Sequence, residues 1–145
     1  MNADVEHPSD EDRCLCGSGD IFGACCGPLL RGQRRAGTAE ALMRSRYTAF
    51  ATRDLEHALA SWHPDTRPRR SALAATLDEE MRWLRLDVRS TTDGGPFDDE
   101  GTVEFVATAR TEQGRRELHE ISHFVREDGT WRYVSGELGA AHGRQ

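Results

Sequence analysis

The chain has 145 residues, of which 37% are hydrophobic and 30% charged, and its formal net charge at pH 7 is −6. This length suits one domain of ordinary size with a small appendage, and such a domain buries a core without help from a metal. A transmembrane helix is excluded, because no apolar stretch approaches the roughly 20 residues that a crossing needs. The negative charge also disfavours broad binding to nucleic acid.

Residues 1–12 are predicted to be disordered, because they are acidic, contain a proline and show no hydrophobic periodicity. They carry five acidic residues and no Lys or Arg, so they lack the basic start and apolar run of a secretory signal. We therefore expect a cytoplasmic protein whose cysteines stay reduced, which favours metal binding over a disulfide framework.

Residues 13–28 form a cysteine module that contains every cysteine of the chain: Cys14, Cys16, Cys25 and Cys26. Four thiolates so close in sequence are typical of one tetrahedral Zn²⁺, with each sulfur about 2.3 Å from the metal. Such a closed site is structural, since it leaves no position for a catalytic water. Iron is the alternative metal. A redox dithiol is disfavoured, because Cys14 and Cys16 lack the two-residue spacer of thioredoxin-like motifs. Gly17 and Gly19 permit the positive φ of a chain that bends around sulfur.

Three helices are predicted after a basic linker over residues 29–37. Thr38 fits an N-cap, and apolar residues at three- and four-residue spacing then continue for about four turns. Asp54 fits the cap of a second helix over residues 55–62, which the following proline stops. A third, shorter helix is predicted over residues 71–81.

The hydrophobic period then changes from helical to alternating, which predicts four strands. In the first, Leu84, Leu86 and Val88 alternate with charged residues and are expected to face the core. The strands are predicted over residues 84–89, 103–110, 116–126 and 131–134. Helices followed by an antiparallel meander indicate the segregated α+β class, with a curved sheet wrapped around the first long helix. This domain is expected over residues 38–138, with a tail over 139–145.

Two sets of residues carry a resemblance to known families. The cysteine window is similar to the SEC-C zinc motif, Cys-x-Cys-Gly-Ser-Gly followed by two further ligands, whose place Cys25-Cys26 takes here. Four later segments resemble YchJ-like proteins: Ala41–Phe50, Trp62–Pro64, Val103–Ala107 and Trp131–Gly136. The resemblance implies a SEC-C zinc module followed by a cone like that of nuclear transport factor 2. It also implies docking, because the SEC-C element of the bacterial secretion ATPase docks a chaperone and other partners.

Four residues are candidates for lining a pocket in the cone: Arg46, His63, Glu104 and His119. Arg46 lies near the buried stripe of the first long helix, where we favour a side chain that either extends its charged end to solvent or pairs with a carboxylate such as Glu104 or Glu120. The alternative is that Arg46 binds an anionic group of a ligand inside the pocket. His119 and Glu120 are neighbours in a strand and should face opposite sides, so they do not form one catalytic dyad.

The sequence favours a docking protein that uses its zinc module to bind a protein partner. The alternative is an enzyme or small-molecule binder with its site in the cone pocket, although no residue spacing is diagnostic of catalysis. A third hypothesis is nucleic-acid binding through the module and the linker arginines Arg31, Arg34 and Arg35, which the net charge disfavours. Sheets of this kind often pair across their open faces, so a dimer is a further expectation.

Overall fold

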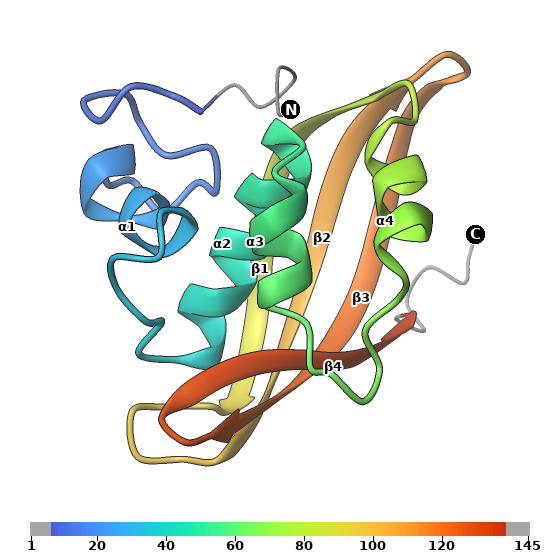
Figure 1. The fold of residues 1–145 in the computed structure, drawn as a ribbon. Helices are drawn as coiled ribbons and strands as arrows, with labels where there is room; N and C mark the ends of the chain where they lie inside the picture. Colours follow the sequence, from blue (N-terminus) through green and yellow to red (C-terminus); the bar gives the residue numbers. More distant parts are fainter. Residues whose placement is uncertain (1–6, 139–145) are drawn as a thin grey trace.

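The computed structural model describes residues 7–138. A 3-10 helix η1 (Phe22–Ala24) and helix α1 (Cys26–Leu30) lie in the N-terminal part. Three helices and then four strands follow: α2 (Ala39–Thr52), α3 (Leu55–Ala60), α4 (Arg70–Leu77), β1 (Met81–Asp93), β2 (Glu100–Thr111), β3 (Gly114–Glu127) and β4 (Thr130–Leu138). The disorder was predicted over residues 1–12, of which 1–6 lie outside the described residues, as does the predicted tail over 139–145. The order of the elements confirms the α+β class (Figure 1).

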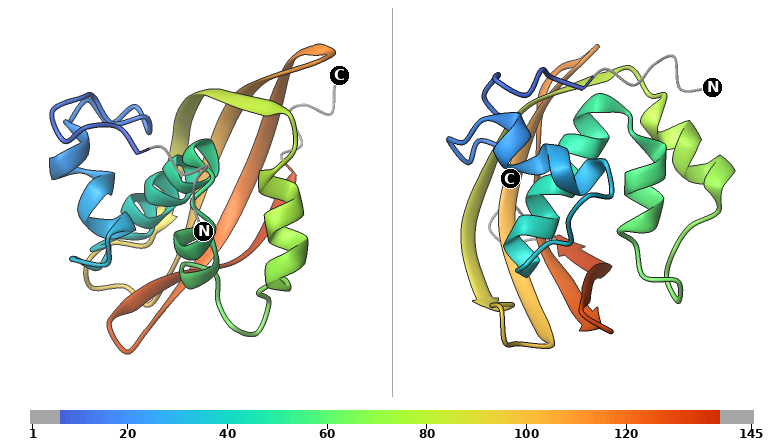
Figure 2. Two further views of the ribbon diagram at one scale, coloured as in Figure 1. Left: turned by 45° about the horizontal axis from the view of Figure 1, so that its top comes forward. Right: turned by 60° about the vertical axis from the view of Figure 1, so that its left-hand side comes forward.

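The four strands form one antiparallel sheet in the order β1-β2-β3-β4. The sheet is strongly curved, and α2, α3 and α4 lie on its concave side (Figures 1 and 2). Phe105 pairs with Glu120 and Ala107 with Leu118 across β2 and β3, so these side chains share one face. The predicted cone, a curved sheet packed over helices, is therefore confirmed.

Helices α2 and α3 begin at the N-cap residues that the sequence predicts. The Thr38 hydroxyl accepts a hydrogen bond from the Ala41 amide at 3.0 Å, and the Asp54 carboxylate accepts one from the His57 amide at 3.1 Å. Each bond satisfies an amide that the helix leaves unpaired at its first turn. Helix α2 ends at Thr52, and the next residue, Arg53, adopts a left-handed conformation with φ 62°. The chain can then turn back at once into α3.

The third helix is shorter than predicted. Helix α4 ends at Leu77, and Met81 begins β1 instead of closing the helix. The three residues between them, Asp78, Glu79 and Glu80, are all acidic. Negative side chains are unfavourable near the negative end of the helix dipole, which explains the early stop.

Strand β1 also departs from the predicted pattern at Leu84, which is 39% exposed. The pairing register with β2 shifts between Trp83 and Arg85. Such a bulge adds one residue to the strand and reverses which side chains face inward. Trp83 therefore lines the interior before the bulge and Leu86 is buried after it. The predicted inward orientation of Leu84 was wrong for this reason.

One apolar cluster joins the cone to the N-terminal segment. From the cone it contains Leu42, Tyr47, Phe105, Phe124 and Trp131, among others, and from the cysteine module it contains Cys14, Cys16, Phe22 and Cys26. The module therefore packs on the cone, on the side of α2 that lies away from α4 (Figures 1 and 2). Within residues 7–138, none of the helices has the length and apolarity that crossing a membrane requires.

Candidate metal centre and cone cavity

The cysteine module is a tight loop that returns the chain to its starting point. The Cys14 amide donates to the Asp20 carbonyl at 2.9 Å, and Arg13 and Ile21 pair as in an antiparallel ladder. Gly17 and Gly19 have φ values of 79° and 96°, which side-chain-bearing residues rarely adopt. The two glycines thus allow the turn that the sequence predicts between the first and second cysteine pairs.

The four sulfur atoms of the module lie close together. All four Sγ atoms lie within 4.8 Å of one another, with Cys16 and Cys25 at 3.6 Å and Cys25 and Cys26 at 4.0 Å. A tetrahedral zinc with bonds of about 2.3 Å separates its sulfurs by about 3.8 Å. Cys14, Cys16 and Cys26 are buried and Cys25 is partly exposed. The residues therefore fit a single four-coordinate metal ion.

The electrostatics of the cluster also fit a cation at its centre. Hydrogen bonds from Cys14 and Cys26 hold the pKa of the Cys16 thiol far below its ordinary value. Burial raises the pKa of Cys25 to about 11, and the thiol hydrogen bonds to Cys14 and Cys16 raise the pKa of Cys26. Without a metal, one thiolate is thus favoured at the expense of its neighbours. A divalent cation would allow all four sulfurs to ionise together.

Hydroxyl and guanidinium groups surround the sulfurs. Thr48 on α2 donates to Cys26 Sγ at 3.4 Å, and the Ser18 hydroxyl lies 3.1 Å from Cys25 Sγ. Arg44, also on α2, donates to the Cys16 carbonyl at 2.7 Å. Such outer contacts orient thiolate ligands and offset their charge. The sequence analysis did not identify Thr48. One sequence feature points to its role: Thr48 lies four residues after Arg44, which places both side chains on one face of the helix.

A cavity of about 290 Å³ lies between the concave face of the sheet and the helices α2 and α4. Its wall is mostly apolar and aromatic, as in many small-molecule sites. The residues that line it include Met43, Arg46, Tyr47, Phe50, Trp62, Leu77, Met81, Trp83, Phe105, Leu118, Glu120, Ser122 and Tyr133. Trp62, Trp83 and Tyr133 are among the largest aromatic side chains in this wall.

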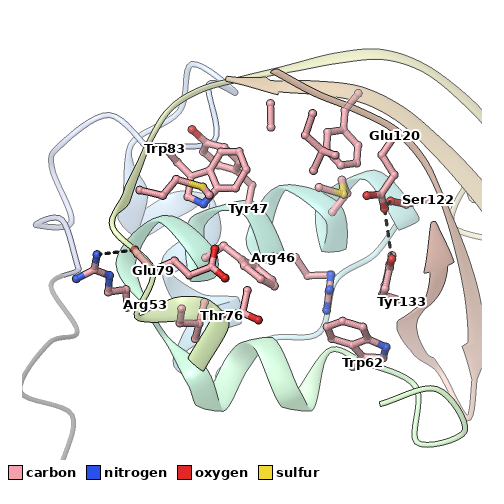
Figure 3. A pocket seen from close by; sticks show the side chains of 17 residues that line it. Arg46, Tyr47, Arg53, Trp62, Thr76, Glu79, Trp83, Glu120, Ser122 and Tyr133 are labelled. Carbon is pink, nitrogen blue, oxygen red and sulfur yellow. Dashed lines mark hydrogen bonds between the residues drawn. The ribbon is translucent and has the colours of Figure 1, made fainter. Parts of the chain in front are cut away.

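Arg46 is the one sequence-predicted pocket residue that lines this cavity. Its guanidinium carbon lies 4.1 Å from the ring centre of Tyr133, 4.7 Å from that of Trp62 and 5.6 Å from that of Phe50. Figure 3 shows the guanidinium lying against Trp62, close to Tyr133. Burial lowers its pKa to about 10, so it remains charged at neutral pH. Cation–π contacts of this kind partly offset the cost of removing the charge from water.

The other three predicted pocket residues lie elsewhere. The Glu104 carboxylate lies 2.6 Å from His119 Nε2, and this pair belongs to the opposite face of the sheet from Phe105 and Glu120. His63 lies 3.0 Å from Glu127 near the β3–β4 hairpin. None of the three lines the cavity.

The polar end of the cavity contains residues that the sequence analysis did not place there. The Glu120 carboxylate accepts hydrogen bonds from Ser122 at 2.7 Å and from the Tyr133 hydroxyl at 3.3 Å (Figure 3). A Cβ at Gly136 would overlap this carboxylate, so the glycine gives it room. Leu118 and Phe124 share strand parity with Glu120 and Ser122, which is the signal that places the pair on the inner face.

Comparison with known proteins gives concordant results. The family model "YchJ, middle NTF2-like domain" matches residues 38–136. A UPF0225 protein of Streptomyces coelicolor is 46% identical over 125 residues, which cover 86% of this chain and 94% of that protein. A SEC-C motif containing protein from Rhodopseudomonas palustris is 36% identical, with a TM-score of 0.79 over 87% of this chain and 98% of that one.

A second SEC-C motif containing protein, from Psychrobacter arcticus, is 25% identical and has a TM-score of 0.71, covering 96% of this chain and 86% of that one. Both solved structures therefore match the cysteine module and the cone together, in agreement with the motif resemblance. The chain belongs to the UPF0225 family of YchJ-like proteins, in which a SEC-C cysteine motif precedes an NTF2-like domain.

Proposed function

We propose that the protein is a docking protein in which one structural Zn²⁺, bound by Cys14, Cys16, Cys25 and Cys26, holds a surface ready for a protein partner. The observation that supports it is the convergence of the four sulfurs within 4.8 Å. A four-thiolate zinc site has no free coordination position, so its role is to fix the loop and not to perform chemistry.

The cysteine module needs such an ion because it contains little else to hold it. Its regular structure is limited to the three residues of η1 and the first residues of α1. Phe22 is its one fully buried aromatic side chain. A segment this short does not bury enough apolar surface to offset the entropy of ordering its backbone. The metal supplies the missing free energy.

The loop that the ion would fix displays two apolar side chains. Leu15 lies between the first two ligands and is 44% exposed, and Ile21 at the end of the same loop is 46% exposed. Apolar side chains displayed on a rigid loop are typical of the centre of a protein interface. We assign this surface to an apolar segment of a partner protein, which agrees with the docking role implied by the SEC-C resemblance.

Elemental analysis of protein purified without added metal tests the first half of the proposal. We expect one zinc per chain and four thiols that become titratable only after zinc is removed. Stoichiometric iron, or pairs of disulfide-bonded cysteines, would overturn it.

Quantitative pull-down tests the second half with three variants of the full chain. Partner capture should be lost with Cys16→Ser, which removes a ligand, and with the double variant Leu15→Ser/Ile21→Ser, which keeps all four ligands. Leu84→Ser is the matched control, because Leu84 is a similarly exposed leucine on the cone. A partner captured equally by the wild-type protein and by zinc-free Cys16→Ser would contradict the docking role.

A further inference from the structure

Arg46 is a buried cation whose hydrogen-bond partners are neutral groups. The residue is 5% exposed. Its Nη1 atom donates to the Ser61 hydroxyl at 2.8 Å and to the Ala58 carbonyl at 3.4 Å. Both bonds come from the same nitrogen, which leaves the Nε–Nη2 edge as the donor pair for another group.

No carboxylate within residues 7–138 lies within 4.0 Å of Arg46 in an ion pair. The pairing that the sequence favoured is therefore not formed. Glu104 lies on the opposite face of the sheet, and the Glu120 carboxylate is bound by Ser122 and Tyr133. Buried charges are normally paired, because desolvating an unpaired one is costly. The lowered pKa of the guanidinium expresses the same cost.

The cavity beside Arg46 combines this charge with an apolar interior. Tyr47, Trp83, Phe105 and Leu118 line the part of the wall contributed by α2 and the sheet. Figure 3 shows Arg46 at the polar end, on the same side as Tyr133 and Glu120, with Trp83 and Tyr47 at the other end. A ligand that fits both ends has an apolar body and one anionic group.

We propose that the cone cavity binds a small organic monocarboxylate, whose carboxylate pairs with the Arg46 guanidinium and whose apolar body lies against Tyr47, Trp83 and Phe105. A planar carboxylate matches the two parallel donors of a guanidinium edge. A doubly charged phosphate fits less well, because the Glu79 and Glu120 side chains also line the cavity and repel added negative charge. This binding site is separate from the zinc module and does not depend on its docking role.

Methionine methyl NMR of the full chain in its zinc-loaded form tests the proposal directly. Met43 and Met81 both line the cavity, and the chain has only three methionines. Met43→Leu and Met81→Leu assign the two signals. The probes are 4-phenylbutyrate and its neutral match 4-phenylbutan-1-ol, which share an apolar body and differ in the charged group. We expect both methyl signals to shift to saturation with the acid, and the alcohol to bind about tenfold more weakly.

The variants separate a binding role of Arg46 from a structural one. Arg46→Gln should abolish the preference for the acid over the alcohol, whereas a purely structural arginine would change both affinities together. Arg70→Gln removes a positive charge from a surface ion pair with Glu56 and should keep the preference. Glu120→Gln retains a hydrogen-bonding side chain without the negative charge and should strengthen binding of the acid alone.

Three results would overturn the proposal. The first is equal affinity of the wild-type protein for acid and alcohol, and the second is the absence of any shift of the Met43 and Met81 signals. The third is a preference for the acid that survives in Arg46→Gln. If circular dichroism shows that Arg46→Gln does not fold, Glu120→Gln decides, because an unchanged affinity for the acid then contradicts a carboxylate at this end of the cavity.

Discussion

The cysteine module and the cone are two neighbouring parts of one chain that are stabilised by different means. The cone buries large apolar side chains such as Phe124 and Trp131 between a four-stranded sheet and its helices. The module buries three cysteines and Phe22 and contains little regular structure. The stability of the cone therefore depends on apolar surface removed from water. If the module binds zinc as proposed, its own stability depends on that ion, and one chain combines a metal-independent fold with a metal-dependent one.

Removal of zinc is the change with the largest expected effect, because structural zinc sites bind with apparent free energies on the order of 10 kcal/mol at neutral pH. We expect chelation to abolish the hydrogen-exchange protection of residues 13–28, measured by mass spectrometry, while the strands of the cone keep theirs. The variant Cys16→Ser should give the same pattern without a chelator. Loss of protection throughout the sheet would show that the cone also requires the metal.

A truncation in the cone core tests the other side of the comparison. Phe124 is 1% exposed and packs on Tyr133, so Phe124→Ala should lower the free energy of unfolding by about 3–5 kcal/mol, measured in urea. Phe97→Ala is the matched control, because Phe97 is 94% exposed and its truncation should change stability by less than about 0.5 kcal/mol. Zinc content should be unchanged in both folded variants. A core truncation without effect on unfolding would contradict an apolar origin of the cone's stability.

The free energy of unfolding should also depend on pH through His57, with a smaller expected change. Burial lowers the pKa of His57 from 6.5 to about 4, with Arg46 and His7 adding to the shift and Asp54 opposing it. The unfolded chain thus takes up a proton at a higher pH than the folded one. Stability should fall as the pH drops below about 6.5, by about 2 kcal/mol between pH 7.5 and pH 5.

The comparison between wild type and His57→Gln isolates this contribution, because both proteins share the acid sensitivity of the thiolates. Urea unfolding of zinc-loaded protein at several pH values should show a shallower decline for His57→Gln. Parallel curves for the two proteins would mean that His57 titrates normally in the folded state.

The sequence predicts the helices and strands well where local chemistry decides them. Thr38 and Asp54 cap their helices because a side-chain oxygen next to a helix start has a defined partner. The bulge in β1 was not predicted, since it depends on the pairing with β2. The early end of α4 at Leu77 was also missed, although the acidic residues that follow it are visible in the sequence. Leu84 follows the alternating pattern in sequence, but the register shift to β2 reverses it.

The cysteine cluster and the cone cavity also differ in how far the sequence predicts them. The cysteine cluster could be predicted, because its ligands lie within one short window and the loop glycines bring them together. The cavity could be predicted only through Arg46. Strand periodicity separates His119 from Glu120, and the shared parity of Glu120 with Leu118 and Phe124 favours Glu120 for the inner face, although Ile121 competes for it. The long-range packing of the sheet decides in favour of Glu120.

Helix α2 is common to both sites. It is 14 residues long, and Arg44 and Thr48 contact the cysteine module while Met43 and Arg46 line the cavity. Helix α2 therefore contacts the cysteine module with one face and the cavity with another. A cavity ligand that displaces α2 would also move the two side chains of α2 that contact the cysteine module. If the module binds zinc as proposed, Co²⁺ in its place would report that movement as a change in its visible absorption spectrum. The spectrum would then show whether a ligand occupies the cone cavity.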